Sequence, residues 1–312
     1  MKHHSFSLLF LLTLNSCSVE PILNEENEEP SIASFKTIIY NTTQTPPLPN
    51  SIQEYVFDAG KLSQINYYDR DDLLQGTKGY AYEDDRISKI TYSLGSAIQY
   101  TQEFIYENDN LVNTNFKDGS GTEYLNYTYS HQNNTVTFDE FRLDGNAQLA
   151  RLATGTMRFD DDENRLSLNR SLVDNSGMDS QEVDIQFDSL GNVIQHTDRS
   201  SDANTASGNL YREVMTYTSQ RNIFYEIYEK VYGRKVMFLL RQDQISTAVN
   251  TFRPKAVSPY IMETFAPSAF ENFIYEIDIE EGSDNRSVEI SYSTSTNDGN
   301  LFTLFKHIAQ YN

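Results

Sequence analysis

A short pattern of aromatic, acidic and aliphatic residues recurs along this chain. It runs through Tyr55–Tyr67 and again, without gaps, through Tyr80–Tyr92, and a third copy begins at Phe104. Weaker copies begin near Tyr127, Met157, Ile185 and Met215. Self-similarity of this kind indicates a chain built from one supersecondary unit that stacks or meanders.

Each unit is predicted to be a β-hairpin. Tyr55 and Phe57 are two residues apart and share one face of a strand, and Ile65 and Tyr67 repeat that spacing on the return strand. Between them, Asp58–Gly60 supplies residues that favour tight turns. The step of three from Leu62 to Ile65 breaks the alternation. Either a bulge lies there, or Leu62 packs on the opposite face.

Polar residues alternate with the apolar ones, as at Ser63, Gln64 and Asn66, so one face of the sheet is expected to meet water. This argues against a membrane-spanning barrel, whose outward band is apolar. A segment at Asn222–Leu240 has apolar residues at helical spacing, although its Tyr and Val content also suits strands. Pro259–Glu271 is expected to form one or two short helical turns.

The predicted fold class is therefore all-β. We expect an antiparallel β-meander of repeated hairpins, closed or nearly closed into a barrel-like sheet, with one or two short helices near the C-terminal third. A last hairpin is expected from Phe273–Ile279 and Ser287–Tyr292. The 21 Tyr and 18 Phe residues supply enough apolar area for a real core.

The N-terminus has the pattern of an export signal, with Lys2 before the apolar run Ser5–Leu14. That run is about half of the roughly 20 residues that cross a bilayer as a helix. Leu14-Asn15-Ser16-Cys17 resembles the lipobox of bacterial lipoproteins. The resemblance implies cleavage between Ser16 and Cys17 and lipidation of the Cys17 sulfur. An ordinary signal peptide, cut nearby, is the alternative.

Cysteine usage favours the lipid, because Cys17 is the only cysteine among 312 residues and no disulfide can use it within the chain. The residues after it are rich in Glu, and this acidic stretch resembles the surface-export signal of Bacteroidota-type lipoproteins. The expected organisation is a signal peptide at 1–16, a lipidated, disordered acidic tether at 17–34 and a single β-repeat domain at 35–312. The expected location is the outer membrane, with the chain lipid-anchored and facing the cell surface, and a periplasm-facing lipoprotein is the alternative.

The repeat itself resembles the tyrosine-aspartate repeats of bacterial Rhs-type toxins and teneurins, with Phe187–Val193 as the best single copy. Together with the lipobox and the acidic tether, the chain resembles a Bacteroidota-type lipoprotein family of unknown function, described as having a porin-like, barrel-shaped β fold. That family carries no established activity to transfer.

The sequence predicts no catalytic residue and no cofactor. His131, His196 and His307 are isolated and are predicted to be surface histidines, and the usual motifs of zinc proteases, serine hydrolases and NTPases are absent. Two carboxylates that converge from distant strands could still make a glycosidase without a local signature.

Two kinds of binding site remain open. Asp160, Asp162 and Glu163 lie in the densest acidic cluster and are candidate Ca²⁺ ligands, although a solvated hairpin tip explains them as well. Tyr and Phe side chains on a concave β surface could stack on sugar or peptide, or could simply fill the core.

A net charge of −21 makes nucleic acid a poor partner. We therefore expect a non-enzymatic envelope lipoprotein, with the membrane as partner through its anchor, that binds a glycan or peptide or serves a structural role. A carboxylate-dependent hydrolase acting on polysaccharide and a tyrosine-aspartate-repeat, toxin-related protein are the alternatives.

Overall fold

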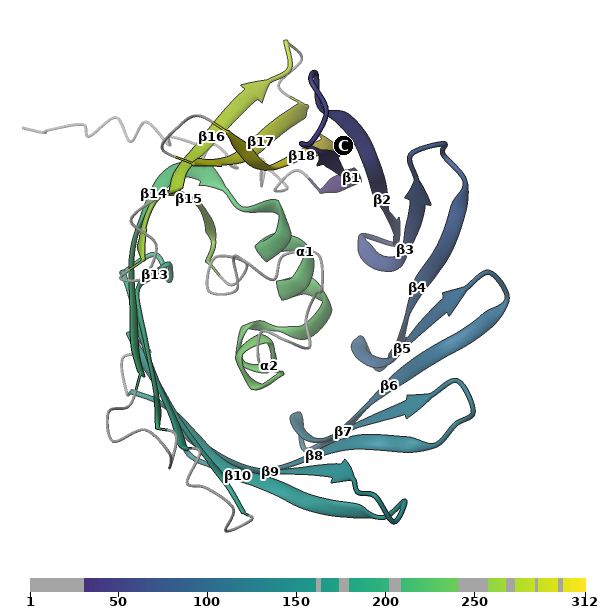
Figure 1. Cartoon of the computed structure of the whole chain (residues 1–312). Helices are drawn as coiled ribbons and strands as arrows, with labels where there is room; N and C mark the ends of the chain where they lie inside the picture. Colours follow the sequence, from purple (N-terminus) through teal and green to yellow (C-terminus); the bar gives the residue numbers. More distant parts are fainter. Residues whose placement is uncertain are drawn as a thin grey trace, which may run out of the picture.

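The fold is a single antiparallel sheet that curves into a ring around two short helices (Figure 1). The computed structural model describes residues 31–160, 164–173, 180–201, 209–240, 258–267, 273–283, 286–296 and 300–312. The predicted all-β meander is confirmed, because each strand pairs with the strand that follows it over most of the chain.

The strands and helices follow one another in a simple order. Their bounds are β1 (Ile32–Asn41), β2 (Leu48–Asp58), β3 (Lys61–Asp69), β4 (Leu74–Glu83), β5 (Arg86–Leu94), β6 (Ala97–Glu107), β7 (Asn110–Asp118), β8 (Glu123–Gln132), β9 (Thr135–Leu143), β10 (Leu149–Phe159), β11 (Arg165–Leu172), β12 (Ser180–Phe187), β13 (Val193–Ser201), β14 (Asn209–Arg221), α1 (Ile223–Tyr232), α2 (Arg234–Leu239), β15 (Tyr260–Pro267), β16 (Phe273–Glu281), β17 (Ser287–Thr296) and β18 (Leu301–Tyr311).

The two terminal strands join the ring. β1 pairs with β18, where Phe35 lies opposite Ala309, and with β2, where Phe35 lies opposite Tyr55. Within the described residues no ladder joins β15 to β16, so the sheet is nearly closed and not closed by hydrogen bonds. β1 begins at Ile32, slightly before the start at residue 35 expected for the β domain.

The hairpin turns confirm the role of Asp, Asn and Gly in the repeat. The two residues of each tight turn both have positive φ, which is the geometry of a type I′ turn and matches the twist of the strands. These pairs are Ala59 (48°) and Gly60 (77°), Asp84 (48°) and Asp85 (66°), and Asn108 (47°) and Asp109 (68°). Gly, Asn and Asp adopt this backbone at the smallest cost.

A bulge follows each of these turns, which settles the irregular step in the repeat. Leu62 and Ile65 are both buried, and Ser63 is the extra residue between them, because Val56 pairs with Gln64 while Phe57 pairs with Leu62. The hydroxyl of Ser63 donates to the Val56 carbonyl at 3.0 Å. Both apolar residues therefore reach the same interior.

Neighbouring hairpins are linked at their turns by a contact that also repeats. Lys61 Nζ lies 2.7 Å from Asp85 Oδ1 in the next turn, and its ammonium lies 5.3 Å from the ring centre of Tyr82. Arg86 makes the same pair of contacts one hairpin further on, with Asp109 at 2.6 Å and with the ring of Tyr106. The basic and acidic positions of the repeat thus connect one unit to the next.

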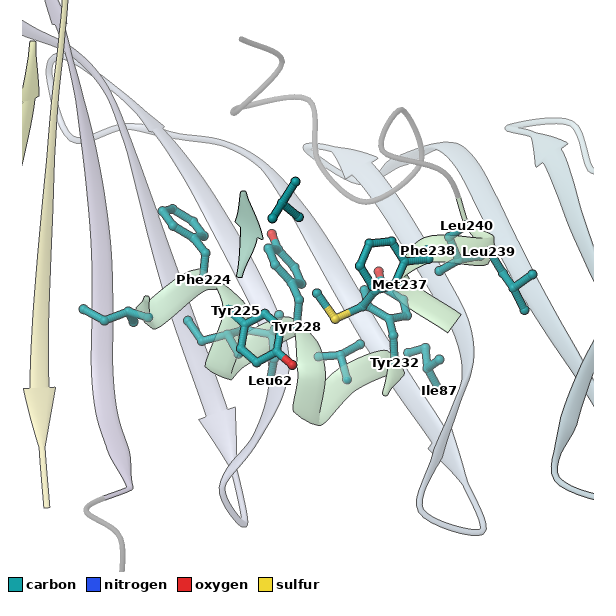
Figure 2. Close-up of a cluster of buried hydrophobic side chains, with 14 of the residues drawn as sticks. Leu62, Ile87, Phe224, Tyr225, Tyr228, Tyr232, Met237, Phe238, Leu239 and Leu240 are labelled. Atoms are coloured by element: carbon teal, nitrogen blue, oxygen red, sulfur yellow. The ribbon is translucent and has the colours of Figure 1, made fainter. Parts of the chain in front are cut away.

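The helices predicted from the spacing at Asn222–Leu240 are present and lie inside the ring (Figure 1). The Asn222 side chain caps α1 by accepting from the Phe224 N–H at 3.1 Å, and Gly233 separates the helices with a φ of 73°. Side chains of both helices pack with Leu62 and Ile87 of the sheet (Figure 2). No helix in the described ranges has the length and apolarity to cross a bilayer.

The prediction of helical turns at Pro259–Glu271 is wrong. Tyr260–Pro267 is strand β15, which pairs with β14 so that Val214 lies opposite Ala266. Pairing with a neighbouring strand outweighs the local preference of Pro259 and Pro267 for the start of a helix. The last predicted hairpin is confirmed as β16 and β17.

Candidate functional site

On β2, β4 and β6 a polar side chain faces the interior of the barrel two residues before a pair of inward aromatic side chains. Along each strand, side chains two residues apart point the same way. Gln53 precedes Tyr55 and Phe57 on β2, and Gln102 precedes Phe104 and Tyr106 on β6. On β4 the corresponding residue is Lys78, which precedes Tyr80 and Tyr82.

Lys78 belongs to a row of inward residues that are direct lateral neighbours across β2 to β6. Tyr55 lies opposite Ile65, Ile65 opposite Lys78, Lys78 opposite Tyr92, and Tyr92 opposite Tyr100. The hairpin registers fix this row, because the bulge near each turn sets which residues face one another.

A cavity of about 260 Å³ lies against this row, inside the ring. Its wall includes Tyr228 of α1, so the helix that enters the barrel forms one side of the space. The lining residues are Gln53, Tyr55, Ile65, Tyr67, Lys78, Tyr92, Tyr100 and Tyr228. Aromatic walls with a few polar groups are typical of small-molecule sites.

Among the described residues that line the cavity, Lys78 is the only charged one. Its side chain is only 8% exposed, and it has no hydrogen bond or ion pair with any residue that the structure describes. Its ammonium lies 5.7 Å from the ring centre of Tyr80. Burial lowers the pKa of Lys78 to about 8, because desolvation disfavours the charged form.

Three tyrosines form the aromatic side of the cavity. The rings of Tyr67 and Tyr92 are perpendicular, with centres 5.8 Å apart, and those of Tyr92 and Tyr100 are 5.3 Å apart and tilted by 32°. Burial raises the pKa of Tyr100 to about 12 and that of Tyr67 further. Both hydroxyls therefore stay protonated at neutral pH and can donate hydrogen bonds.

The two carboxylates that are fully buried among the described residues lie elsewhere and are already paired. Glu140 accepts from Arg170 at 2.8 Å and from Arg142 at 3.0 Å. Glu213 lies 3.2 Å from Nδ1 of His196. No observation brings these two carboxylates together as the pair that a glycosidase requires.

The prediction of surface histidines is wrong for two of the three. His196 and His307 are 9% and 7% exposed, because their strands carry them on the inward face beside Glu213 and Thr37. His131 is half-buried and lies 2.7 Å from the carbonyl oxygen of Leu111. All three therefore contact neighbouring groups of the sheet.

The acidic cluster is only partly visible. Asp160 accepts from the Arg165 N–H at 3.1 Å across the turn after β10, while Asp162 and Glu163 lie outside the described residues. Within the described ranges no three His, Cys, Asp or Glu side chains gather as metal ligands. Cys17 and Ser16 also lie outside the described residues.

The outer face carries a hollow of about 370 Å³ over β11 to β13. Its charged residues pair with one another, since Arg165 Nε donates to Asp184 at 2.6 Å and Arg199 lies 3.9 Å from Glu182. Because these charges already have partners, the inner cavity with its unpaired cation is the stronger candidate site.

Sequence reasoning missed Lys78, although a signal for it existed. Lys78, Tyr80 and Tyr82 are spaced two residues apart on one strand and therefore point to the same face. A strand that turns the two tyrosines inward must also turn the lysine inward. The same spacing places Gln53 and Gln102 inside. Of the aromatics expected either to stack on sugar or peptide or to fill the core, Tyr55 is buried in the core and also lines the cavity.

No family model matches the chain, and no curated protein matches it. Among solved structures, the chain is similar to a porin-like protein from Bacteroides uniformis ATCC 8492, with 11% identity, a TM-score of 0.42 and coverage of 91% of this chain and 98% of the other. It is also similar to a protein with unknown function from Bacteroides fragilis NCTC 9343, with 13% identity, a TM-score of 0.31 and coverage of 36% and 88%. At these identities and scores neither likeness bears on function.

Proposed function

We propose that this protein is a non-enzymatic, lipid-anchored envelope protein that binds a small ligand inside its barrel. The observation that carries the ligand-binding part is the unpaired cation of Lys78 in the wall of the tyrosine-lined cavity.

A ligand would explain why an unpaired lysine lies in the wall of the cavity. A buried charge without a partner destabilises a fold, and an apolar residue of similar volume would pack there at less cost. A lysine that costs stability in the empty barrel is explained if a ligand supplies its missing partner. The interior wall around it is concave and mostly aromatic, as binding sites usually are.

The anchoring part rests on the sequence at Leu14–Cys17. The described chain begins at the tight-turn end of the barrel, because β1 is antiparallel to β2 and β2 ends at the tight turn of Ala59 and Gly60. The cavity residues Tyr67, Tyr92 and Tyr100 lie towards the other ends of their strands. An anchor at Cys17 would therefore connect to the tight-turn end of the sheet, opposite the end that carries these cavity residues.

Ligand binding is tested by screening a library of small molecules against protein with isotope-labelled tyrosine rings. Tyr67→Phe, Tyr92→Phe and Tyr100→Phe assign the cavity resonances, and Tyr68→Phe, on the outer face, serves as a control. Hits should shift the cavity tyrosines and leave Tyr68 unchanged. A screen without hits, or hits that shift only outer tyrosines, would overturn the ligand-binding part.

Anchoring is tested by Cys17→Ser in the native host. The variant should be released as a soluble form or keep its signal uncleaved, because no other cysteine can take the lipid. A normally processed variant that remains membrane-bound would contradict the anchor and leave the ligand-binding proposal intact.

A further inference from the structure

We infer, resting on the proposed function, that the ligand is a small carboxylate whose ring presents an apolar face, held by its charge on Lys78 and by that face against Tyr67, Tyr92 and Tyr100. The charge, the hydrogen-bonding capacity and the shape of the cavity wall together select this chemistry.

The charge of the ligand follows from the acids around Lys78. Two acidic residues on strands of the same wall, Glu54 on β2 and Glu103 on β6, lie on the outer face of the sheet, because each is adjacent in sequence to an inward residue. Glu54 accepts from the Tyr68 hydroxyl at 3.0 Å, and Glu103 accepts from Lys117 at 2.6 Å. Neither carboxylate reaches the cavity, and no carboxylate lines it among the residues that the structure describes, so the inferred ligand is the one that supplies an anion to Lys78.

The hydrogen-bonding capacity of the wall fits a carboxylate. The hydroxyls of Tyr67, Tyr92 and Tyr100 have no hydrogen-bond partner among the described residues. Tyr80 Oη and Gln102 Nε2, from the next row of the sheet, are buried without a partner within the same ranges. An ionised carboxylate has about four lone-pair sites and only accepts, which complements a wall that is rich in donors.

The shape of the ligand follows from the rings and the volume. Perpendicular Tyr67 and Tyr92 present an edge and a face, and the tilted pair of Tyr92 and Tyr100 continues the surface. Such a corner accepts a flat apolar face by stacking. The volume of about 260 Å³ lies just below the usual range for ligand pockets, which favours a small ligand.

Two sources share this chemistry, an aromatic carboxylate and a uronic acid, because both combine a carboxylate with a ring that stacks on tyrosine. The test uses isothermal titration calorimetry with benzoate and glucuronate. Their uncharged counterparts, benzamide and glucose, have the same rings. The variant is Lys78→Met, and the matched control is Lys89→Met, which removes the same charge from the exposed outer face of β5.

At least one carboxylate should bind the wild-type barrel about 10- to 100-fold more tightly than its uncharged counterpart, as expected for a charge-assisted hydrogen bond. Lys78→Met should abolish that preference, and Lys89→Met should keep it. Whichever of the two carboxylates binds identifies the source. Uncharged counterparts that bind equally well, or a preference for the carboxylate that survives in Lys78→Met, would overturn the inference. The proposal that the barrel binds a ligand would still stand.

A second measurement needs no variant. Near pH 8 Lys78 is partly deprotonated, and a bound anion raises its pKa, so binding should take up a fraction of a proton per ligand. The uptake appears as a dependence of the binding heat on the ionisation enthalpy of the buffer. Binding without proton uptake, or no binding of either carboxylate, would contradict the inference. The tyrosine screen decides separately whether the cavity binds any ligand.

Discussion

The hydroxyl of Tyr82 donates a 2.7 Å hydrogen bond to the main-chain carbonyl of Leu62, which belongs to the preceding hairpin. Leu62 lies beyond the end of the β3–β4 ladder, whose last pair on this side is Gln64 with Gly79, so its carbonyl has no strand partner there. The second aromatic of one repeat thus completes the hydrogen bonding of the repeat before it. Tyr217 makes the same kind of bond to the Val193 carbonyl at 2.6 Å.

Tyr82→Phe is therefore expected to lower the free energy of unfolding by about 1 kcal/mol, the usual net value of one hydrogen bond. Tyr106 occupies the same position one repeat later, and its hydroxyl has no hydrogen-bond partner among the described residues. Tyr106→Phe is the matched control and should change the stability less. Equal losses in denaturant unfolding of the two variants would show that the hydrogen bond does not matter.

Ala59→Asn is expected to stabilise the protein by about 0.5–1 kcal/mol. Ala59 is exposed and has a φ of 48°, a left-handed conformation in which alanine is strained and asparagine is tolerated. The other two strong copies of the repeat have Asp84 and Asn108 at this turn position. Thermal unfolding measures the gain, and Ala81→Asn, at an exposed strand position, is the control that should give none.

The repeat allowed most of the sheet to be predicted, because its turn residues and its alternation act locally. The type I′ turns follow from Asp, Asn and Gly at fixed positions, and the side of the sheet on which Tyr55 and Phe57 lie follows from their spacing. The choice between a bulge and a flipped Leu62 depends on how two strands pair. One strand read alone does not contain that information.

The site was harder to predict for the same reason. Lys78, Tyr92 and Tyr100 are neighbours only because three strands, β4, β5 and β6, are in register, and Tyr228 joins them because α1 turns into the ring. A helical period at Asn222–Leu240 indicates a helix without indicating which side of the sheet it covers. The strand at Tyr260–Pro267 was missed because its prolines resemble helix starts until β14 is present as a partner.

Lys78→Met is expected to increase the stability of the empty barrel at neutral pH by about 1–3 kcal/mol, since it replaces an unpaired buried charge by an apolar side chain. The pH dependence checks the cause. The pKa of Lys78 is about 8 in the folded protein, against 10.5 as its ordinary value, so above pH 8 the unfolded chain binds more protons than the folded one.

The stability of the wild-type protein should consequently rise between about pH 8 and 9.5, where the tyrosines are still neutral, relative to that of Lys78→Met. The difference between the two proteins should shrink over the same window. Denaturant unfolding at several pH values measures both trends. A variant that is less stable than the wild type at every pH would show that the lysine is paired in solution.

His307 is expected to make the barrel sensitive to acid. Its ring packs against Phe35, Phe224 and Tyr292, and its Nδ1 lies 3.0 Å from the Thr37 hydroxyl. Desolvation in this apolar setting lowers the pKa of His307 to about 3, from an ordinary value of 6.5. Between these values the unfolded chain binds a proton that the folded chain does not, so this contribution to stability is present above pH 6.5 and declines as the pH falls towards 3.

By pH 5 the loss from this one group should reach about 2 kcal/mol. His307→Gln removes the titrating ring and keeps a side chain that can hydrogen-bond with Thr37, so it should flatten the decline between pH 6.5 and 5 relative to the wild type. His131→Gln is the control, because His131 is only half-buried, and its curve should follow that of the wild type. If the free energy of unfolding of His307→Gln falls with pH in parallel with that of the wild type, the acid sensitivity comes from the carboxylates. These titrate at lower pH and are present in both proteins.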